Sequence, residues 1–593
     1  MQKNNDKYID KFPVNETGTE FTSDNIETWK EENSIPVDAT AEDVTKTYKE
    51  KYGIKKEKIE DVRKIIAVRY GIEKEGYSAM KGYIISKEVS EKSIAVLEES
   101  NSYFPGIAIT IMPIRNYQYG NLASHIIGYI GPIGSDELKK YKDENYGIND
   151  YIGKMGVESV FEKYLRGDDG IKQVDMSIDG TRTGEYVTKE ATAGSDVILT
   201  IDANLQKVTE ESLKNNIEKI RSGGFGTKSE AHSGAAVVLN TKTGEILAMA
   251  SYPDYEPELF LNGISTEKWK EYTEGTSALM NRTIQNSYAP GSIFKMATAI
   301  AGLETEKISR TEQVNDVGIY NASKDYKPRC WIYSSTGGGH GRLNVSGAIK
   351  HSCNYYFYEV ATRTGIEAIE KYATYFGLGE KTNVELPGEV SGTLAGKSLY
   401  SRLGRTWYYG DTLSAAIGQS ENSFTPLQMA KYIAMLTNGG KDIDVTILKK
   451  IVDVDGNEID KKEIEEYVNS RLGLETKEKK DLNISQENLD AVLEGMRSVT
   501  TETGGTAYSI FKNFEIEVGG KTGSSEAGKN VNAWFAGFAP YDDPEIAVVV
   551  FVENGGHGYY TAEVLRDVVE EYFGLNEEVE EDRTAISYTQ KTN

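Results

Sequence analysis

Three short patterns in the chain combine residue types that together can transfer an acyl group through a serine. They are Ser-x-x-Lys at Ser292–Lys295, Ser-x-Asn at Ser352–Asn354 and Lys-Thr-Gly at Lys521–Gly523. A lysine amine that burial keeps neutral can accept the proton of a serine, whose oxygen then attacks a carbonyl carbon. Each pattern is weak evidence alone, because short combinations of common residues also arise by chance.

Further copies of each pattern lie elsewhere in the chain. Ser265 and Ser509 also begin a Ser-x-x-Lys, Ser420 begins another Ser-x-Asn, and Lys242 begins another Lys-Thr-Gly. Lys242 lies at the tip of a predicted β-hairpin, where a solvated turn accounts for it. Ser265 lies in a polar segment and Ser509 leaves no room for a Ser-x-Asn before Lys521, so we expect surface or packing roles for both. Ser420 stays a weaker alternative to the Ser-x-Asn at position 352.

The context of Ser292 favours it as the nucleophile. It follows Ala-Pro-Gly and opens an apolar stretch, which predicts a helix with Ser292 and Lys295 on one face. The positive end of that helix favours negative charge on the serine oxygen. Ser509 begins the identical tetrapeptide Ser-Ile-Phe-Lys, so the order of the companion patterns is what separates the two copies.

The elements that must position these residues predict a sheet interrupted by a helical insert. Ala235–Asn240 and Glu245–Ser251 predict one β-hairpin, and Ala533–Ala539 and Ile546–Glu553 predict another far downstream. A long and mostly helical stretch separates the two hairpins. We expect a binding cleft where this insert meets the sheet.

The Lys-Thr-Gly and Ser-x-Asn patterns are expected to line that cleft. Alternating apolar and acidic residues from Phe514 predict a strand that closes at Lys521–Gly523. This strand points the Lys521 cation out of a sheet edge, where a carboxylate of the substrate can bind. Gly523 allows the substrate to approach closely. Ser352–Asn354 precede an aromatic, helix-like run that can bring a hydroxyl and an amide to the Ser-x-x-Lys pair.

Length and composition predict several domains. With 593 residues the chain exceeds what one hydrophobic core supports. We predict α/β and α+β architecture in four segments. They are a polar N-terminal lobe (1–60), an α+β pedestal (61–195), a catalytic domain (196–576) that begins at the strand Asp196–Asp202, and an acidic tail (577–593).

Charge and hydropathy exclude some kinds of partner. The chain has 67 Lys plus Arg against 92 Asp plus Glu, and the net charge of −25 at pH 7 repels phosphate backbones. We therefore expect no nucleic-acid partner. No run approaches the roughly 20 apolar residues that span a bilayer, and the N-terminus has no apolar core of a signal peptide. If the protein works outside the membrane, we expect its anchor to have been removed or to lie upstream.

Both cysteines and two of the five histidines lie between positions 330 and 353. Zinc binds Cys and His in tetrahedral sets, so Cys330, His340 and Cys353 can hold one structural ion, with Asp325 or His351 as the fourth ligand. The spacing matches none of the common zinc-finger patterns. Packing of two buried thiols, or a disulfide between them, are the alternatives. A zinc ion here would fix the Ser-x-Asn helix to the preceding loop and set the width of the active site.

In this order and layout, the three patterns resemble the penicillin-binding protein and serine β-lactamase superfamily. Over roughly residues 107 to 574 the chain is similar to class B penicillin-binding proteins of the elongation or sporulation type. The similar segments are Arg115–Gly131, Gly153–Glu158 and Leu165–Gly167 for the pedestal, and Leu199–Asp202, Gly418–Gln419, Thr425–Gln428 and Trp534–Pro540 for the transpeptidase domain. The resemblance implies a five-stranded antiparallel sheet with helices on both faces, an all-helical insert and an α+β pedestal. Members of the class begin with a transmembrane helix, so we expect a trimmed form of a protein of the extracytoplasmic membrane face.

The resemblance also implies a peptidoglycan D,D-transpeptidase. Ser292 attacks the penultimate D-Ala of a stem peptide, the terminal D-Ala leaves, and an amine of a neighbouring strand resolves the acyl-enzyme. The other implied roles are Lys295 as general base, Ser352 as proton relay, Asn354 as amide-binding residue, Lys521 and Thr522 as carboxylate-binding residues, and the backbone N–H groups of Ser292 and Ser524 as the oxyanion hole. Removing one such donor costs about 3 to 4 kcal/mol.

The same resemblance implies ligands and partners. β-lactams mimic the D-Ala-D-Ala dipeptide and trap Ser292. The chemistry requires no cofactor, so zinc at the cysteine cluster would be structural. A separate, membrane-embedded glycosyltransferase is the implied protein partner.

Two other functions fit the same patterns. A hydrolase, either a D,D-carboxypeptidase or a β-lactamase, would use water in place of the acceptor amine. The long pedestal favours a transpeptidase over it. A non-catalytic penicillin sensor or scaffold would be acylated without transferring the acyl group, and the intact set of site residues argues against it.

Overall fold

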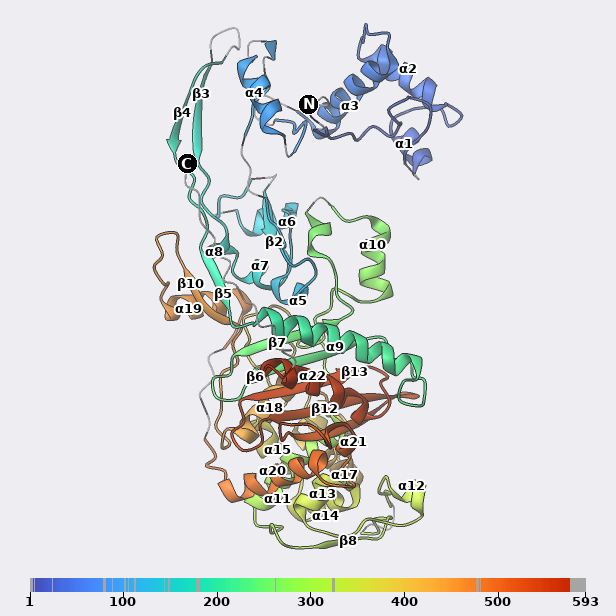
Figure 1. Ribbon diagram of the computed structural model, residues 1–593, viewed down its shortest axis with the longest axis vertical. Helices are drawn as coiled ribbons and strands as arrows, with labels where there is room; N and C mark the ends of the chain where they lie inside the picture. The colour runs from blue at the N-terminus through green and yellow to red at the C-terminus, as the bar shows by residue number, and fades with distance from the viewer. Residues whose placement is uncertain are drawn as a thin grey trace. The chain divides into compact units, whose positions relative to one another are not determined.

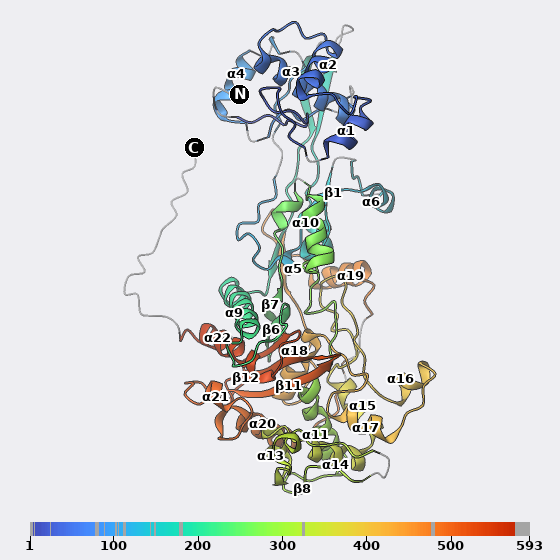
Figure 2. The same cartoon turned by 90° about the vertical axis from the view of Figure 1, so that its right-hand side faces the viewer.

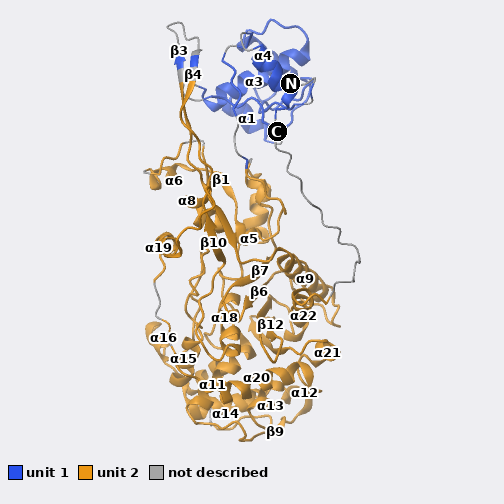
Figure 3. Ribbon diagram, turned by 60° about the vertical axis from the view of Figure 1, so that its left-hand side comes forward, with its two compact units in different colours: residues 1–114, 174–185 blue, residues 115–173, 186–593 orange. Residues whose placement is uncertain are grey.

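The structure is a computed structural model that describes residues 4–575 (Figure 1). Short gaps in this description fall at residues 5, 24, 78–81, 88, 101–102, 105, 111–113, 143, 148–149, 177–181, 262, 323–325, 476–478 and 480. The chain divides into two compact units, one formed by residues 1–114 and 174–185 and the other by residues 115–173 and 186–593 (Figure 3). The predicted acidic tail, 577–593, lies outside the described residues.

The first unit is built from short helices around an aromatic core. A capping box at Thr40, whose hydroxyl accepts from the Asp43 N–H, starts the second helix. The Arg63 side chain is buried, and it donates to the carbonyl of Phe12 at 2.9 Å and to the carboxylate of Asp10 at 2.9 Å. The core residues include Phe12, Val44, Tyr48, Ile66 and Tyr70. The helices are α1 (Ile26–Glu32), α2 (Ala41–Lys51), α3 (Ile59–Glu75) and α4 (Glu91–Glu99).

The second unit contains an antiparallel sheet of five strands in the order β11-β12-β13-β6-β7. Both predicted hairpins are confirmed, and they meet where β13 pairs with β6, with Val549 opposite Val237. Alternate residues of the central strands face two separate cores, so that Val549 and Val550 contribute to different clusters. The strands are β6 (Gly234–Asn240), β7 (Ile246–Tyr252), β11 (Gly519–Ala527), β12 (Asn530–Ala539) and β13 (Ile546–Val552).

Helices cover both faces of this sheet, as predicted (Figures 1 and 2). One core joins the sheet to α9 (Ala203–Ser222) and α22 (Ala562–Tyr572). The other, larger core joins its opposite face to α11 (Lys295–Glu304), α18 (Pro426–Thr437) and α20 (Gln486–Thr501). No helix in the described part of the chain is long and apolar enough to cross a membrane.

In its described residues, the insert between β7 and β11 consists of helices, irregular segments and three short strands. β8 (Val314–Asp316) pairs with β9 (Gly341–Leu343), and β10 (Leu448–Val452) pairs with β5 (Asp196–Leu199). The helices of the insert that matter for the site are α13 (Val345–Lys350), α14 (Asn354–Thr364), α15 (Ile366–Tyr375) and α17 (Tyr409–Ala416). Its remaining longer helix is α19 (Lys461–Leu472).

Residues 115–173 belong to the second unit and pack onto its core. Phe161 and Tyr164 are buried in the same cluster as α11 and α18. The elements of this part are α5 (Ser124–Ile127), β1 (Ile130–Pro132), α6 (Ser135–Lys140), β2 (Tyr151–Gly153), α7 (Gly156–Val160) and α8 (Glu162–Leu165). The two strands that follow, β3 (Ile171–Met176) and β4 (Arg182–Lys189), pair with each other and are divided between the two units.

The predicted start of the Lys-Thr-Gly strand is wrong. The alternating residues from Phe514 are not a strand, and β11 begins at Gly519 and continues past Lys-Thr-Gly to Ala527. Phe514 packs outside the sheet against the α9–α22 core. Gly519 forms the strand because it has no side chain, since a Cβ there would lie 2.3 Å from Cζ of Phe538.

Candidate active site

The Ser-x-x-Lys segment at Ser292 begins with a turn of 3₁₀ helix and continues as an α-helix. Ser292 lies in η5 (Gly291–Phe294), and Lys295 is the first residue of α11. Side chains three residues apart lie on one side of a 3₁₀ turn, so Ser292 and Lys295 share a face. Gly291 has a φ of +55°, and a Cβ there would lie 2.5 Å from the carbonyl oxygen of Ser524. The turn therefore lies directly against β11.

The Lys295 side chain is fully buried and ties the nucleophile segment to the Ser-x-Asn pattern. Its Nζ donates to the Ser352 carbonyl at 2.8 Å, to Ser352 Oγ at 3.3 Å and to Asn354 Oδ1 at 2.6 Å. Burial lowers the pKa of Lys295 to about 8, although the nearby thiols of Cys353 and Cys330 act in the opposite direction. A lysine with this pKa has a neutral fraction near pH 7 and can accept a proton.

Ser352 lies between the two lysines of the site. Its backbone has a φ of +51°, a region that residues other than glycine occupy rarely. Besides the 3.3 Å contact with Lys295, Ser352 Oγ accepts from Lys521 Nζ at 2.9 Å. A hydroxyl can accept and donate at once, so this position suits a group that passes a proton between neighbours.

Lys521 lies on the edge strand β11, but its side chain is fully buried and turned toward Ser352 rather than out of the sheet edge as predicted. Its Nζ also donates to the Thr522 carbonyl at 2.8 Å. Burial, and secondarily the charge of Lys295, hold the pKa of Lys521 well below its usual range. An anion beside this amine would favour its charged form.

The residues after Lys521 line the edge of the sheet. Thr522 is 8% exposed, whereas Ser524 is exposed and accepts from the Gly558 N–H at 3.2 Å. A Cβ on Gly523 would lie 2.8 Å from both Ile293 Cγ1 and the Pro290 carbonyl oxygen. Glycine is required here by the nucleophile turn, a reason that the sequence did not indicate.

The additional copies of the three patterns lie in other surroundings. Ser265 is an N-cap whose hydroxyl accepts from the Lys268 N–H, and Ser509 is exposed. Ser420 is within 3.2 Å of the Tyr400 hydroxyl. Lys242 lies in the turn between β6 and β7 and forms an ion pair with Asp543 at 2.8 Å. None of these contacts joins a second pattern.

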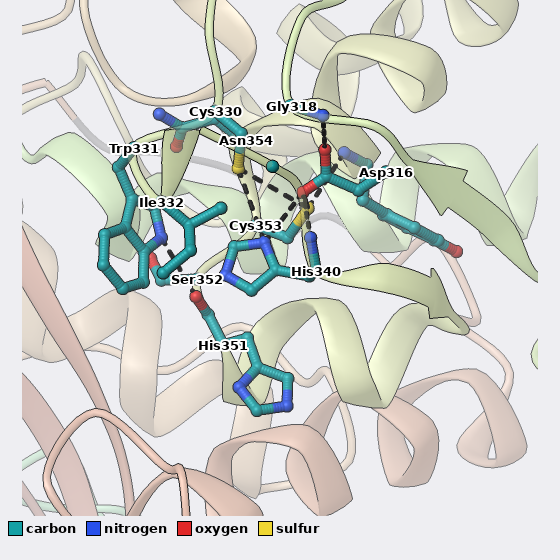
Figure 4. Close-up of polar contacts among 12 residues, drawn as sticks. Asp316, Gly318, Cys330, Trp331, Ile332, His340, His351, Ser352, Cys353 and Asn354 are labelled. Atoms are coloured by element: carbon teal, nitrogen blue, oxygen red, sulfur yellow. Dashed lines mark hydrogen bonds and ion pairs between the residues drawn. The ribbon is translucent and has the colours of Figure 1, made fainter. Parts of the chain in front are cut away.

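Four potential metal ligands meet beside the Ser-x-Asn pattern (Figure 4). Ligand atoms of Asp316, Cys330, His340 and Cys353 all lie within 4.8 Å of one another. Cys353 is the N-cap of α14, so the cluster adjoins Ser352 and Asn354 directly. The two sulfurs are 3.9 Å apart, which excludes the disulfide alternative in this structure.

The distances that involve the two sulfurs match a tetrahedral zinc site, whereas His340 Nδ1 and Asp316 Oδ2, which are hydrogen-bonded at 2.8 Å, would have to separate to about 3.4 Å to share an ion. In a tetrahedral site, Zn–S bonds of about 2.3 Å and Zn–N or Zn–O bonds of about 2.1 Å place two sulfurs about 3.8 Å apart and a sulfur about 3.6 Å from a nitrogen or oxygen. Cys330 Sγ lies 3.5 Å from His340 Nδ1, and Cys353 Sγ lies 3.3 Å from Asp316 Oδ2. The hydrogen bond with Cys353 outweighs burial and, with that of His340, lowers the pKa of Cys330 to about 5, which favours the thiolate that binds metal.

Asp316, the fourth member of this cluster, was not among the predicted ligands. Asp325, named instead, lies outside the described residues, and His351 stacks on His340 with ring centroids 5.6 Å apart without joining the four. One signal could have found Asp316. It opens an Asp-x-Gly turn after a short strand, and its carboxylate accepts from the Gly318 N–H at 2.7 Å.

Comparison with known proteins places these features in a family. The penicillin binding protein transpeptidase domain matches residues 234–570, and the penicillin-binding protein dimerisation domain matches residues 15–199. The peptidoglycan D,D-transpeptidase MrdA of Acinetobacter baumannii is 30% identical over 505 residues, covering 82% of this chain and 70% of that protein.

Solved structures agree. A complex between penicillin-binding protein PBP2 and MreC from Helicobacter pylori matches with a TM-score of 0.67 and 26% identity over 83% of this chain and 85% of that one. A second match is a chain from a structure of a peptidoglycan synthase complex that coordinates polymerization and crosslinking. Its TM-score is 0.67, with 29% identity over 84% of this chain and 83% of that one. The chain therefore belongs to the penicillin-binding protein family, as a class B transpeptidase of the elongation type.

Proposed function

We propose that the chain cross-links peptidoglycan stem peptides by acyl transfer through Ser292. The Ser292 oxygen forms an ester with the carbonyl carbon of the penultimate D-Ala, and the amide bond to the terminal D-Ala breaks. An amine of a neighbouring strand then forms a new amide and releases the serine. The observation that carries the proposal is the buried amine of Lys295, which shares a face with Ser292 and bonds Ser352 and Asn354.

The proton moves between these groups in the proposed mechanism. Lys295 accepts the Ser292 proton, because burial lowers its pKa to about 8. Ser352, within 3.3 Å of that amine, hands a proton to the departing nitrogen. Asn354 orients the substrate through its side-chain amide.

Lys521 and Thr522 bind the terminal carboxylate of the donor in this proposal. Burial disfavours the charge of Lys521 in the free site, so an arriving carboxylate restores that charge and forms a strong ion pair. The backbone N–H groups of Ser292 and Ser524 stabilise the oxyanion. The contact of Gly291 with the Ser524 carbonyl supports this pairing, because it brings η5 and β11 together.

We further propose that Asp316, Cys330, His340 and Cys353 bind one structural zinc ion. Bound zinc supplies a fixed tetrahedral link and takes no part in the acyl transfer. Cys353 follows Ser352 directly, so the link holds the left-handed backbone of Ser352 in place. His340 Nδ1 donates to Asp316 Oδ2 at 2.8 Å, and a zinc ion held by these two atoms would take the place of the shared proton.

The setting of the enzyme is proposed from its relatives. The PBP2 of Helicobacter pylori forms a complex with MreC, and another relative belongs to a peptidoglycan synthase complex. We infer that this chain works at the extracytoplasmic face of the membrane beside a separate glycosyltransferase. The two family matches support a boundary near residue 195 between pedestal and catalytic domain, while the boundaries at 60 and 576 remain proposals.

Mass spectrometry of the penicillin adduct tests the function. Benzylpenicillin should add its mass to the peptide that contains Ser292, and the adduct should persist while a D-amino acid acceptor exchanges onto a stem-peptide donor. Rapid loss of the adduct would indicate a hydrolase. A stable adduct without any transfer would indicate a sensor or scaffold.

A further inference from the structure

Residues 502–507, which we call the bridging loop, connect two parts of the active site. The loop lies between α20 (Gln486–Thr501) and α21 (Tyr508–Phe511). At one end, Glu502 forms an ion pair at 2.6 Å with Lys350, two residues before Ser352. At the other end, the hydroxyls of Thr506 and Thr522 are hydrogen-bonded at 2.8 Å. The bridging loop therefore joins the Ser-x-Asn side of the cleft to the Lys-Thr-Gly side.

The backbone of the bridging loop is closely held. A Cβ on Gly505 would lie 2.4 Å from the carbonyl oxygens of Ser498 and Val499, so glycine is needed for this approach to α20. The Ala507 side chain is buried, and its N–H donates to the Val499 carbonyl at 3.1 Å. Thr506 lies between these two fixed residues. Its hydroxyl is thus presented to Thr522 by packing that does not depend on the substrate.

The chemistry of hydroxyl groups determines which way this hydrogen bond runs during binding. A carboxylate only accepts hydrogen bonds, so Thr522 must donate its single O–H to bind one. The contact between the two threonines can persist only if Thr506 is the donor. Thr506 then donates to the Thr522 oxygen, so the Thr522 proton points away from the loop. The chain of hydrogen bonds from Thr506 through Thr522 to the carboxylate strengthens the bond to that charged acceptor.

We propose that Thr506 is a positioning residue that orients the Thr522 hydroxyl and so selects donors with a free terminal carboxylate. The inference rests on the proposed function, because it assumes that Thr522 binds that carboxylate. Thr506 itself touches no substrate atom in this proposal. Its removal should affect the binding of carboxylate-bearing donors and leave the chemistry at Ser292 unchanged.

Acylation of the full chain by two probes tests this role. The probes are benzylpenicillin and its methyl ester, which differ in the carboxylate alone, and the readout is the second-order rate of adduct formation by intact-protein mass spectrometry. Thr506→Val keeps the side-chain shape and removes the donor. We expect it to lower the rate with benzylpenicillin about tenfold and the rate with the ester less than twofold.

Two further variants separate positioning from folding. Thr506→Ser restores the hydroxyl and should return the benzylpenicillin rate to within about twofold of the unmodified chain. Thr503→Val makes the same substitution at an exposed threonine of the bridging loop and should leave both rates unchanged. Equal loss with both probes in Thr506→Val, or no loss with either, overturns the assignment. Failure of the proposed function would look different, because the unmodified chain would then lose its adduct rapidly or transfer no acyl group to a D-amino acid acceptor, whatever the ratio of the two acylation rates in Thr506→Val.

Discussion

The tetrapeptide Ser-Ile-Phe-Lys occurs at two places in this chain, and the surroundings of the two copies differ. Both copies bury their phenylalanine, since Phe294 is 1% exposed and Phe511 is 6% exposed. In the first copy the lysine is enclosed and bonded to Ser352 and Asn354. In the second copy, Ser509 and Lys512 are both exposed.

The local sequence therefore determines that the phenylalanine is buried, but it does not determine whether the lysine is enclosed. The apolar pair of the tetrapeptide packs into a core in either place, because burial of an aromatic side chain is favourable wherever a core is adjacent. Reactivity requires a second segment that encloses the lysine and lowers its pKa. Here that segment begins 57 residues later, at Ser352. Substitutions made in parallel in the two copies test this reading.

The largest expected effect is the loss of the nucleophile. Ser292→Ala should abolish covalent labelling by benzylpenicillin and all acyl transfer, because no other oxygen can form the ester. Ser509→Ala should label at the unmodified rate. Adducts are measured by intact-protein mass spectrometry and located by peptide mapping. An adduct that survives in Ser292→Ala, or one that maps to the second copy, would contradict the comparison.

The next effect concerns the two lysines. Lys295→Met should slow acylation by about 10² to 10⁴ because it removes the general base, while Lys512→Met should change it by less than twofold. The pKa of Lys295 also predicts the direction in which the acylation rate changes with pH. Lys295 must be neutral to accept a proton, and its pKa is about 8, so the acylation rate should rise with pH and reach half its plateau near pH 8.

Stopped-flow measurement of acylation between pH 6 and 10 checks this profile. The Lys512→Met variant serves as the control and should show the same curve as the unmodified chain. A rate that falls as the pH rises through 8 would indicate that the charged form of Lys295 is the active one.

Strands with long and regular apolar patterns could be predicted from the sequence, and strands without such patterns could not. β12 and β13 are apolar strands joined by a short turn, and they could be recognised from that pattern. β11 begins with Gly519 and Gly520, which carry no side chains and therefore give no periodic signal. The aromatic rings of Phe535 and Phe538 leave room at these two positions for glycine alone. The acidic alternation before β11 resembled a strand, but its Phe514 and Ile516 pack against the α9–α22 core without pairing in the sheet.

The candidate site was predictable in its residues but not in its contacts. The patterns indicated Ser292, Lys295 and Lys521, yet the burial of Lys521 depends on Ser352, which is 169 residues away. Asp316 was missed for the same reason, since the other three members of its cluster come from a separate loop and from the start of α14. Contacts between distant segments require the tertiary structure.

Removing the proposed zinc ion, which lies beside the segment that encloses Lys295, should have a smaller effect on acylation. Dialysis against a chelator should release about one zinc ion per chain and lower Tm by roughly 5 °C, since the ion binds the folded state alone. Acylation at Ser292 should slow only several-fold, because the ion positions Ser352 and has no part in the reaction. Elemental analysis and calorimetry measure the two quantities.

Cys353→Ser gives the matched test within the chain. It keeps the size of the side chain and weakens the zinc site, so its Tm should fall as in the chelated protein and respond no further to the chelator. Lack of zinc in the unmodified chain, or an unchanged Tm in the variant, would refute the metal. The comparison of the two copies would then rest on the protein contacts alone.

The smallest effect belongs to the Ser-x-x-Lys at Ser265. This serine is the N-cap of α10 (Thr266–Lys270), and its hydroxyl accepts from the Lys268 N–H at 3.1 Å. Ser265→Ala should cost about 1 kcal/mol locally, which speeds hydrogen exchange at the Lys268 amide about fivefold. Ser265→Asp keeps the cap and should exchange at the original rate. Acylation should be unchanged in both variants, because this serine stabilises a helix end and faces no second polar segment; any loss of labelling would give it a part in the reaction that its surroundings do not support.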